Sequence, residues 1–169
     1  MLASQKIIDA FNQQAGNEMG ASMQYISIAA YFESENLMTL AEFFFQQSDE
    51  EREHSMKFVK FVLEVGGAVA FPAIPAPPAK FSNARDAVQA ALDWEEEVTR
   101  QIYGLVDLAQ EERNHIAKRF LDWFVDEQLE EVATMSTLLG IVERAGEDNL
   151  LFVEQYLSRH DIRGEEDEG

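Results

Sequence analysis

The sequence predicts an all-α protein, a bundle of four long helices with a long crossover between the second and third and a short fifth helix. Apolar residues recur at intervals of three and four along four stretches of roughly thirty residues each. All four prolines fall between the second and third of these stretches. The other breaks are short and polar, which is typical of antiparallel neighbours in a bundle.

The first two helices are predicted over Ser4 to about Phe32 and over Leu37 to Val65. Ser4 is a suitable N-cap, because its hydroxyl can accept a hydrogen bond from the first turn. Only the polar segment 33–36 separates these helices, so we expect them to lie side by side and antiparallel.

The second half of the chain follows a Pro-rich crossover over residues 68–81. Gly66 and Gly67 end the second helix, and an extended segment of this length can run the full height of a bundle. The helices on either side of it can therefore be parallel. The remaining predicted helices run from Ser82 or Asn83 to about Glu111, from His115 to Ala145, and from Glu147 to about Ser158. We expect residues 1–158 to form one domain and the acidic tail 159–169 to be disordered.

Composition narrows the classes of function. The chain has 169 residues, a length that fits one domain, and it has no cysteine, which excludes disulfides, zinc ribbons and thiol catalysis. Lys and Arg number 13 against 32 Asp and Glu, a net charge of -19 that disfavours nucleic acid and anionic membranes and favours cations. The N-terminus is too polar for a signal peptide, and no apolar run approaches the about 18 residues of a membrane helix, so we expect a cytoplasmic protein.

Four acidic residues and one histidine lie in stripes that are otherwise apolar, near the middle of their helices. Glu51 and His54 are three residues apart, so they project from one face of the second helix. The other three acids are Glu18, Glu95 and Glu131, one on each remaining long helix. At equal height in a bundle they would converge in a dry interior, where repulsion forbids full ionisation without cations. Carboxylate and imidazole are ligands for iron, manganese or zinc.

Each of these residues alone has a simpler interpretation. An isolated Glu-x-x-His occurs often by chance, and one buried Glu can reach a helix end, an arginine or water. Tyr25 and Trp123 are by default core aromatics, and the acidic run 127–131 is by default a solvated face. The coincidence of four centred acids with His54 favours a site for two metal ions.

The chain resembles the non-haem ferritins of bacteria and archaea over nearly its whole length. The segments that carry the resemblance are NEMGASMQYISIAAYF, QQSDEEREH, WEEEVTRQI and LDWFVDEQLEEV, one on each long helix. The resemblance implies a ferritin-like bundle in which Glu18, Glu51 and His54 bind one iron. It also implies that Glu51, Glu95 and Glu131 bind the second iron, with Gln128 beside them as a weak or outer ligand.

The resemblance also implies a third iron site and an electron source. Glu50, Glu127 and Glu130, with Glu131, match the third site, and the last three must cluster because they differ by three and four positions on a helix. Tyr25 and Trp123 match aromatic residues that can supply electrons. No haem is expected, because Arg52 stands where bacterioferritins carry a haem-ligating methionine.

The implied activity is oxidation of Fe²⁺ to Fe³⁺ by O₂ or H₂O₂, with storage of ferric oxyhydroxide inside a hollow 24-subunit shell. Two alternatives remain open. One is a diiron oxidase or peroxidase that stores no iron, and the other is a metal-free helical scaffold whose central acids are protonated or bound to water.

Overall fold

Helices account for the regular structure of the part of the chain that is described, residues 1–163 in this computed structural model. The elements are α1 (Gln5–Ser34), α2 (Met38–Glu64), α3 (Ala84–Glu111), α4 (His115–Ala145), the 3₁₀ turn η1 (Glu147–Asn149) and α5 (Leu150–Leu157). Within these residues there is no strand, and no helix combines the length and apolarity needed to cross a membrane. The predicted all-α fold class is confirmed.

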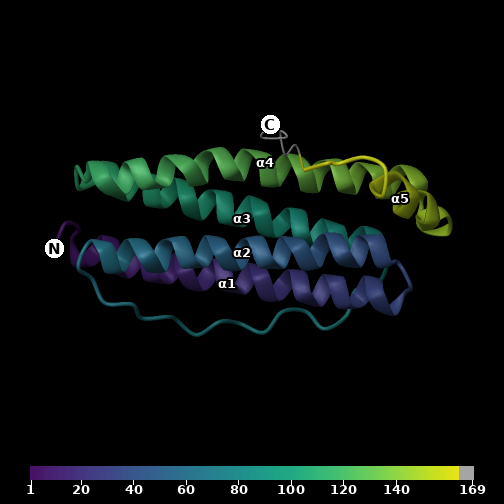
Figure 1. Cartoon of the computed structure of the whole chain (residues 1–169), viewed down its shortest axis with the longest axis horizontal. Coiled ribbons are helices and arrows are strands. Elements are labelled where there is room, and N and C mark those ends of the chain that lie inside the picture. The colour runs from purple at the N-terminus through teal and green to yellow at the C-terminus, as the bar shows by residue number, and fades with distance from the viewer. Residues whose placement is uncertain (164–169) are drawn as a thin grey trace.

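The four long helices form two antiparallel pairs, α1 with α2 and α3 with α4 (Figure 1). The crossover between α2 and α3 runs along the outside of the first pair for most of the length of the bundle (Figure 1). As a result α2 and α3 run in the same direction, as the long Pro-rich connection predicted. The short α5 packs across the end of the bundle against α4 and α2.

Side-chain caps fix where the helices begin. Ser4 accepts a hydrogen bond from the backbone N–H of Ile7 at 3.2 Å, as the sequence predicted. Asn83 and Asn114 cap α3 and α4 in the same way, each accepting from the N–H three residues on, at 2.8 and 2.9 Å. The start of α2 has no side-chain cap of its own. Glu154 on α5 takes that role, because its carboxylate accepts from the first N–H groups of α2 at 2.7 and 2.8 Å.

The apolar core is divided into two clusters at the two ends of the bundle. One cluster includes Phe32 and Phe44, and the other includes Phe58 and Phe124. On every long helix the predicted central acid falls between residues of the first cluster and residues of the second. The acids therefore share one layer at mid-height, which is the arrangement that the sequence pattern predicted.

Close packing holds the crossover against α1. Asn12 donates to the carbonyl of Ala68 at 2.9 Å and accepts from the N–H of Ala70 at 3.2 Å. A Cβ atom at Gly16 would lie only 2.3 Å from the ring of Pro72. Glycine is therefore required at position 16 for the crossover to lie this close to the helix.

The C-terminal part differs from the sequence prediction at the start of α5. Helix α5 begins at Leu150, not at Glu147, because Gly146 has φ 74° and Glu147 instead accepts hydrogen bonds from the first N–H groups of α3. Residues 159–163 of the tail expected to be disordered turn back along the bundle, where the hydroxyl of Thr134 donates to the carbonyl of Ile162 at 3.5 Å. The rest of that tail, 164–169, lies outside the described residues.

Candidate metal centre

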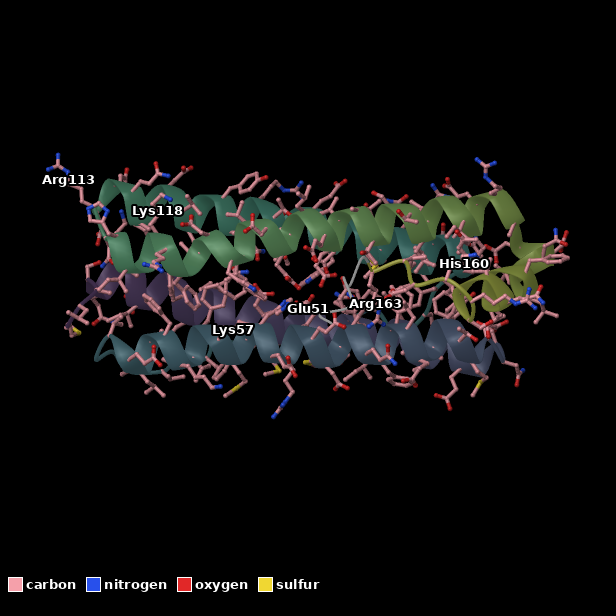
Figure 2. The ribbon with its side chains drawn as sticks, turned by 45° about the horizontal axis from the view of Figure 1, so that its top comes forward. Glu51, Lys57, Arg113, Lys118, His160 and Arg163 are labelled. Atoms are coloured by element: carbon pink, nitrogen blue, oxygen red, sulfur yellow. The ribbon has the colours of Figure 1, made fainter. Side chains whose placement is uncertain are left out.

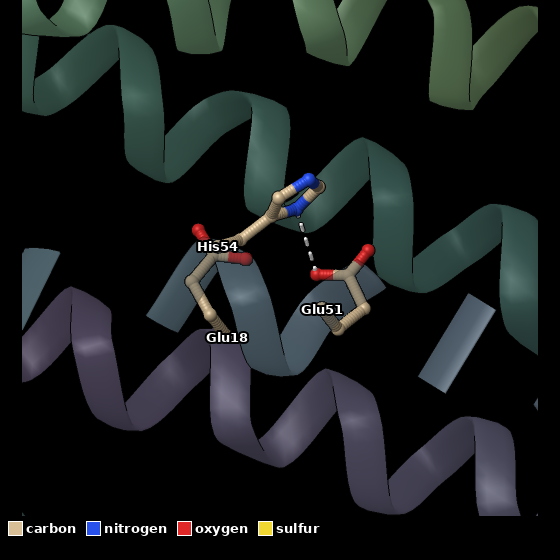
Figure 3. Close-up of side chains that lie close together, drawn as sticks. All are labelled: Glu18, Glu51 and His54. Atoms are coloured by element: carbon tan, nitrogen blue, oxygen red, sulfur yellow. Dashed lines mark ion pairs between the residues drawn. The ribbon is translucent and has the colours of Figure 1, made fainter. Parts of the chain in front are cut away.

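The predicted central residues come together from all four long helices. Glu18 on α1, Glu51 and His54 on α2, Glu95 on α3 and Glu131 on α4 are each at most 5% exposed. Ligand atoms of Glu18, Glu51 and His54 lie within 4.8 Å of one another, and so do those of Glu51, Glu95 and Glu131. Glu51 belongs to both groups. The arrangement can therefore hold two cations side by side with one shared carboxylate. Figure 3 shows the first of the two groups, Glu18, Glu51 and His54.

Unpartnered polar atoms mark the first of these groups as a ligand site. Among the described residues, Glu18 Oε2, Glu51 Oε1 and His54 Nδ1 are buried and accept or donate no hydrogen bond. His54 Nδ1 lies 3.4 Å from Glu51 Oε2, a contact without hydrogen-bond geometry (Figure 3). Leaving such atoms unpaired costs about 1–3 kcal/mol each. A cation between them would satisfy all three at once, so the residues fit a metal ion.

Two glutamine amides each bind one oxygen of a central carboxylate. Gln14 donates to Glu18 Oε1 at 2.8 Å, and Gln47 donates to Glu131 Oε2 at 2.7 Å. The two amides thereby fix the orientation of these carboxylates and leave their remaining oxygens for a ligand. Neither glutamine was predicted as a site residue from the sequence. Their signal was available, since each precedes a central acid by one helical turn on a buried face.

Glu95 accepts three hydrogen bonds from two neighbouring side chains, Gln128 and Tyr25. The predicted site residue Gln128 donates to Glu95 Oε2 at 3.1 Å and to its carbonyl oxygen at 3.2 Å. The hydroxyl of Tyr25 donates to Glu95 Oε1. Tyr25 is fully buried and in direct contact with a carboxylate of the centre, where the sequence analysis expected a nearby aromatic residue.

Burial shifts the pKa values of the central acids upward. It raises the pKa of Glu95 to about 7, and burial together with the charge of Glu95 raises the pKa of Glu131 to about 8. The pKa values of Glu18 and Glu51 are raised for the same main reason, by removal of the carboxylates from water. At neutral pH the metal-free centre therefore retains protons that a cation must displace.

His54 connects the central layer with a second group of acids. Burial alone would lower its pKa, but contacts with Glu127 and Glu51 raise that pKa to about 11. Its Nε2 atom lies 3.5 Å from Glu127 Oε1, and ligand atoms of His54, Glu127 and Glu131 lie within 4.8 Å of one another. The imidazole is thus shared between the two groups.

A pocket of about 250 Å³ opens beside His54 between α2 and α4. The predicted third-site residues Glu50, Glu127 and Glu130 all line it. Among the described residues, the carboxylates of Glu50 and Glu130 do not join a ligand group as compact as those of the central layer. The structure thus brings the three acids to one pocket, with Glu127 closest to the centre.

Trp123 lies at the rim of this pocket and is 39% exposed, so it is no core residue. Its ring contacts His54 edge-on with centroids 5.4 Å apart, and the ammonium of Lys57 lies 4.1 Å from its ring centroid. Tyr25 and Trp123 therefore flank the centre on different sides, one buried and one in contact with solvent.

Comparison with known proteins agrees with this geometry. The family model of the ferritin-like domain matches residues 8–145. The chain is 42% identical to ferritin BfrB of Mycolicibacterium smegmatis over 86% of this chain and 80% of that protein. It is 34% identical to a bacterial non-heme ferritin of Staphylococcus aureus, over 88% and 89% of the two chains. An open pore ferritin from Archaeoglobus fulgidus superposes with a TM-score of 0.90 at 33% identity, over 95% of this chain and 99% of that one.

The chain therefore belongs to the ferritin family. Its fold is the ferritin four-helix bundle with a short C-terminal helix, as the sequence predicted. Within the described residues, the Glu and His cluster of the bundle centre can hold metal ions.

Proposed function

We propose that the protein oxidises Fe²⁺ at a diiron centre and stores the ferric product. The observation that carries this proposal is the pair of buried ligand groups that share Glu51, one of which has unpartnered atoms on Glu18, Glu51 and His54. Membership of the ferritin family supports iron as the cation. In this assignment Glu18, Glu51 and His54 bind one iron, and Glu51, Glu95 and Glu131 bind the other.

The reaction takes one electron from each of two Fe²⁺ ions. With O₂ as oxidant, two electrons and two protons give H₂O₂ and leave two Fe³⁺, and with H₂O₂ as oxidant the same two electrons and two protons give two water molecules. Hard carboxylate oxygens favour Fe³⁺ over Fe²⁺, so the ligand set makes oxidation favourable. Protons displaced from the centre when iron binds are available beside the oxidant, since Glu95 and Glu131 have raised pKa values.

The partly exposed carboxylates beside the centre can bind Fe³⁺ as it leaves the centre. Glu127 shares His54 with the centre, and Glu50 and Glu130 line the same pocket. We infer that these acids form a third iron site, which receives Fe³⁺ from the centre. Gln128 keeps Glu95 oriented, and Tyr25 can supply an electron through its contact with that carboxylate.

Storage requires assembly into a hollow shell, which we propose to contain 24 copies of the chain in the cytoplasm. The net charge of -19 favours entry of cations and nucleation of ferric oxyhydroxide. Sedimentation tests the assembly. A shell of 24 chains of 19.2 kDa has a mass of roughly 460 kDa, whereas a monomer or dimer would favour a diiron oxidase that stores no iron.

Replacement of ligands tests the centre itself. Glu51→Ala and His54→Ala should slow aerobic Fe²⁺ oxidation, followed by absorbance of the ferric product, by at least about a hundredfold, because ligand loss should cost no less than loss of an outer partner. Glu64→Ala is the matched control, since Glu64 lies on the same helix but is exposed and lies outside the pocket beside the centre. Unchanged oxidation by the Glu51 and His54 variants would exclude this assignment. Metal analysis of the purified protein separates it from a metal-free scaffold.

A further inference from the structure

We propose that Arg163 is a resident cation of the pocket between α2 and α4, where it competes with a third metal ion for Glu50. This inference rests on the proposed function, because the competing ion comes from the diiron centre. It assigns a role to the C-terminal segment 158–163, which the central site does not use.

Three contacts hold the guanidinium of Arg163 in one place. Its Nη1 atom lies 2.9 Å from Glu50 Oε1, and its Nη2 atom donates to the carbonyl oxygen of Phe43 at 3.1 Å. The guanidinium carbon lies 4.7 Å from the centroid of the Phe43 ring. The Arg163 side chain is only 16% exposed. Figure 2 shows Arg163 at mid-length of the bundle, near Glu51 and alongside α2.

The segment that delivers Arg163 is itself attached to the bundle. Ile162 packs against the apolar core at the α5 end, and its carbonyl oxygen accepts a hydrogen bond from Thr134. After α5 the chain returns between α4 and α2 toward the middle of the bundle (Figure 2). The position of Arg163 thus follows from packing of the residues before it.

The charges around the pocket explain why a cation belongs there. Acidic residues dominate its lining: Glu50, Glu53, Glu127, Glu130 and Glu131. The cationic residues that line it, among those described, are Lys57, Arg163 and, in the metal-free centre, the protonated His54. His54 belongs to the central layer, and Lys57 lies over the ring of Trp123. A guanidinium stays charged at every pH at which proteins fold, so protonation changes cannot remove it. It must move aside before a metal ion can bind Glu50 through the same oxygen.

Competition of this kind lowers the affinity of the third site and leaves the central layer unaffected. An ion that reaches Glu127 from the centre finds one of its remaining ligands, Glu50, already paired. We therefore expect the third site to bind this ion weakly and to release it, as a site that transfers Fe³⁺ to a mineral requires. Arg163 acts here as a residue that sets affinity and takes no part in the chemistry.

Metal titration of the assembled, chelator-treated protein tests the proposal. Zn²⁺ serves as the probe because it has no redox chemistry, and isothermal titration calorimetry resolves tight from weak sites. Arg163→Gln should leave the two central ions unchanged and strengthen the third by about two- to fivefold, the range expected for loss of a partly exposed ion pair. Arg163→Lys keeps a positive charge and should remain closer to the wild type.

Arg159→Gln is the matched control, because it removes the same charge from an exposed position four residues earlier. An equal gain in Arg159→Gln would show a general charge effect and overturn the proposal, as would an unchanged or absent third ion in Arg163→Gln. A wild-type protein that binds fewer than two central ions would overturn the proposed diiron function, and the role of Arg163 would fall with it.

Discussion

Glu95→Gln in the metal-free protein should abolish part of the pH dependence of its stability. Burial raises the pKa of Glu95 from the ordinary 4.5 to about 7, so between these pH values the native state binds more protons than the unfolded state. Stability therefore falls as pH rises through this window. One pKa unit corresponds to about 1.4 kcal/mol, so ionisation of Glu95 costs the native state about 3 kcal/mol by pH 8.

Glutamine at position 95 cannot ionise, so it avoids this free-energy cost, and it can still form hydrogen bonds with Tyr25 and Gln128. Its amide oxygen can accept from the hydroxyl of Tyr25, and the amide of Gln128 can turn to accept from the new N–H groups. Removal of the charge at position 95 also relieves Glu51 and Glu131, whose pKa values it helps to raise. We expect the variant to match the wild type at pH 5 and to exceed it by about 3 kcal/mol at pH 8.

Thermal unfolding followed by circular dichroism measures this difference. For a chain of this size about 3 kcal/mol corresponds to a rise in Tm of about 6–12 °C at pH 8. Glu96→Gln, one residue along α3 and exposed, is the control for a change of net charge in the same assembly. Equal falls of Tm with pH in the wild type and Glu95→Gln would refute the idea that burial keeps Glu95 protonated.

Three further predictions concern packing, capping and metal affinity. Gly16→Ala should destabilise the protein by about 1–3 kcal/mol, because the new Cβ atom would clash with the ring of Pro72. Gly104→Ala is the control: its Cβ atom would lie in open space, so it should stabilise the protein by up to about 1 kcal/mol. The Tm of each variant measures the effect. Glu154→Ala should cost about 1–2 kcal/mol and increase amide exchange in the first turn of α2, whose N–H groups it leaves without an acceptor; unchanged exchange there would contradict this role. Affinity for Zn²⁺ should rise with pH between about 6 and 8, because metal binding displaces protons from carboxyl groups with raised pKa values, and a flat profile by calorimetry would count against it.

Local pattern predicted most of the fold and the central layer. Long amphipathic stretches define helices with little ambiguity, and caps such as Ser4 and Asn83 mark their starts within a residue or two. Acids such as Glu18 and Glu95 could be identified because an unpaired carboxylate in an apolar stripe is costly, and because four such acids, one on each long helix, coincide with His54. Their convergence followed once the helices were aligned at mid-height.

The parts that escaped prediction depend on contacts between distant residues. Gln47 is a neutral polar residue of a kind common on any helix, and only the packed structure shows that it orients Glu131 on another helix. Gln14, by contrast, contacts Glu18 one turn along the same helix and could have been predicted. The contact of Arg163 with Glu50, 113 positions away in sequence, has no local signal either. Likewise Glu147 could not be recognised as a cap for α3, because its partners lie on another helix.

The candidate ligands are divided between two helical hairpins whose covalent connection is the crossover. Glu18, Glu51 and His54 belong to the α1–α2 hairpin, and Glu95 and Glu131 belong to the α3–α4 hairpin. A cation shared through Glu51 would fasten one hairpin to the other across their seam. The protein has no cysteine, so this metal link would cross-link the two hairpins as a disulfide otherwise could. Unlike a disulfide, it would be removed by a chelator.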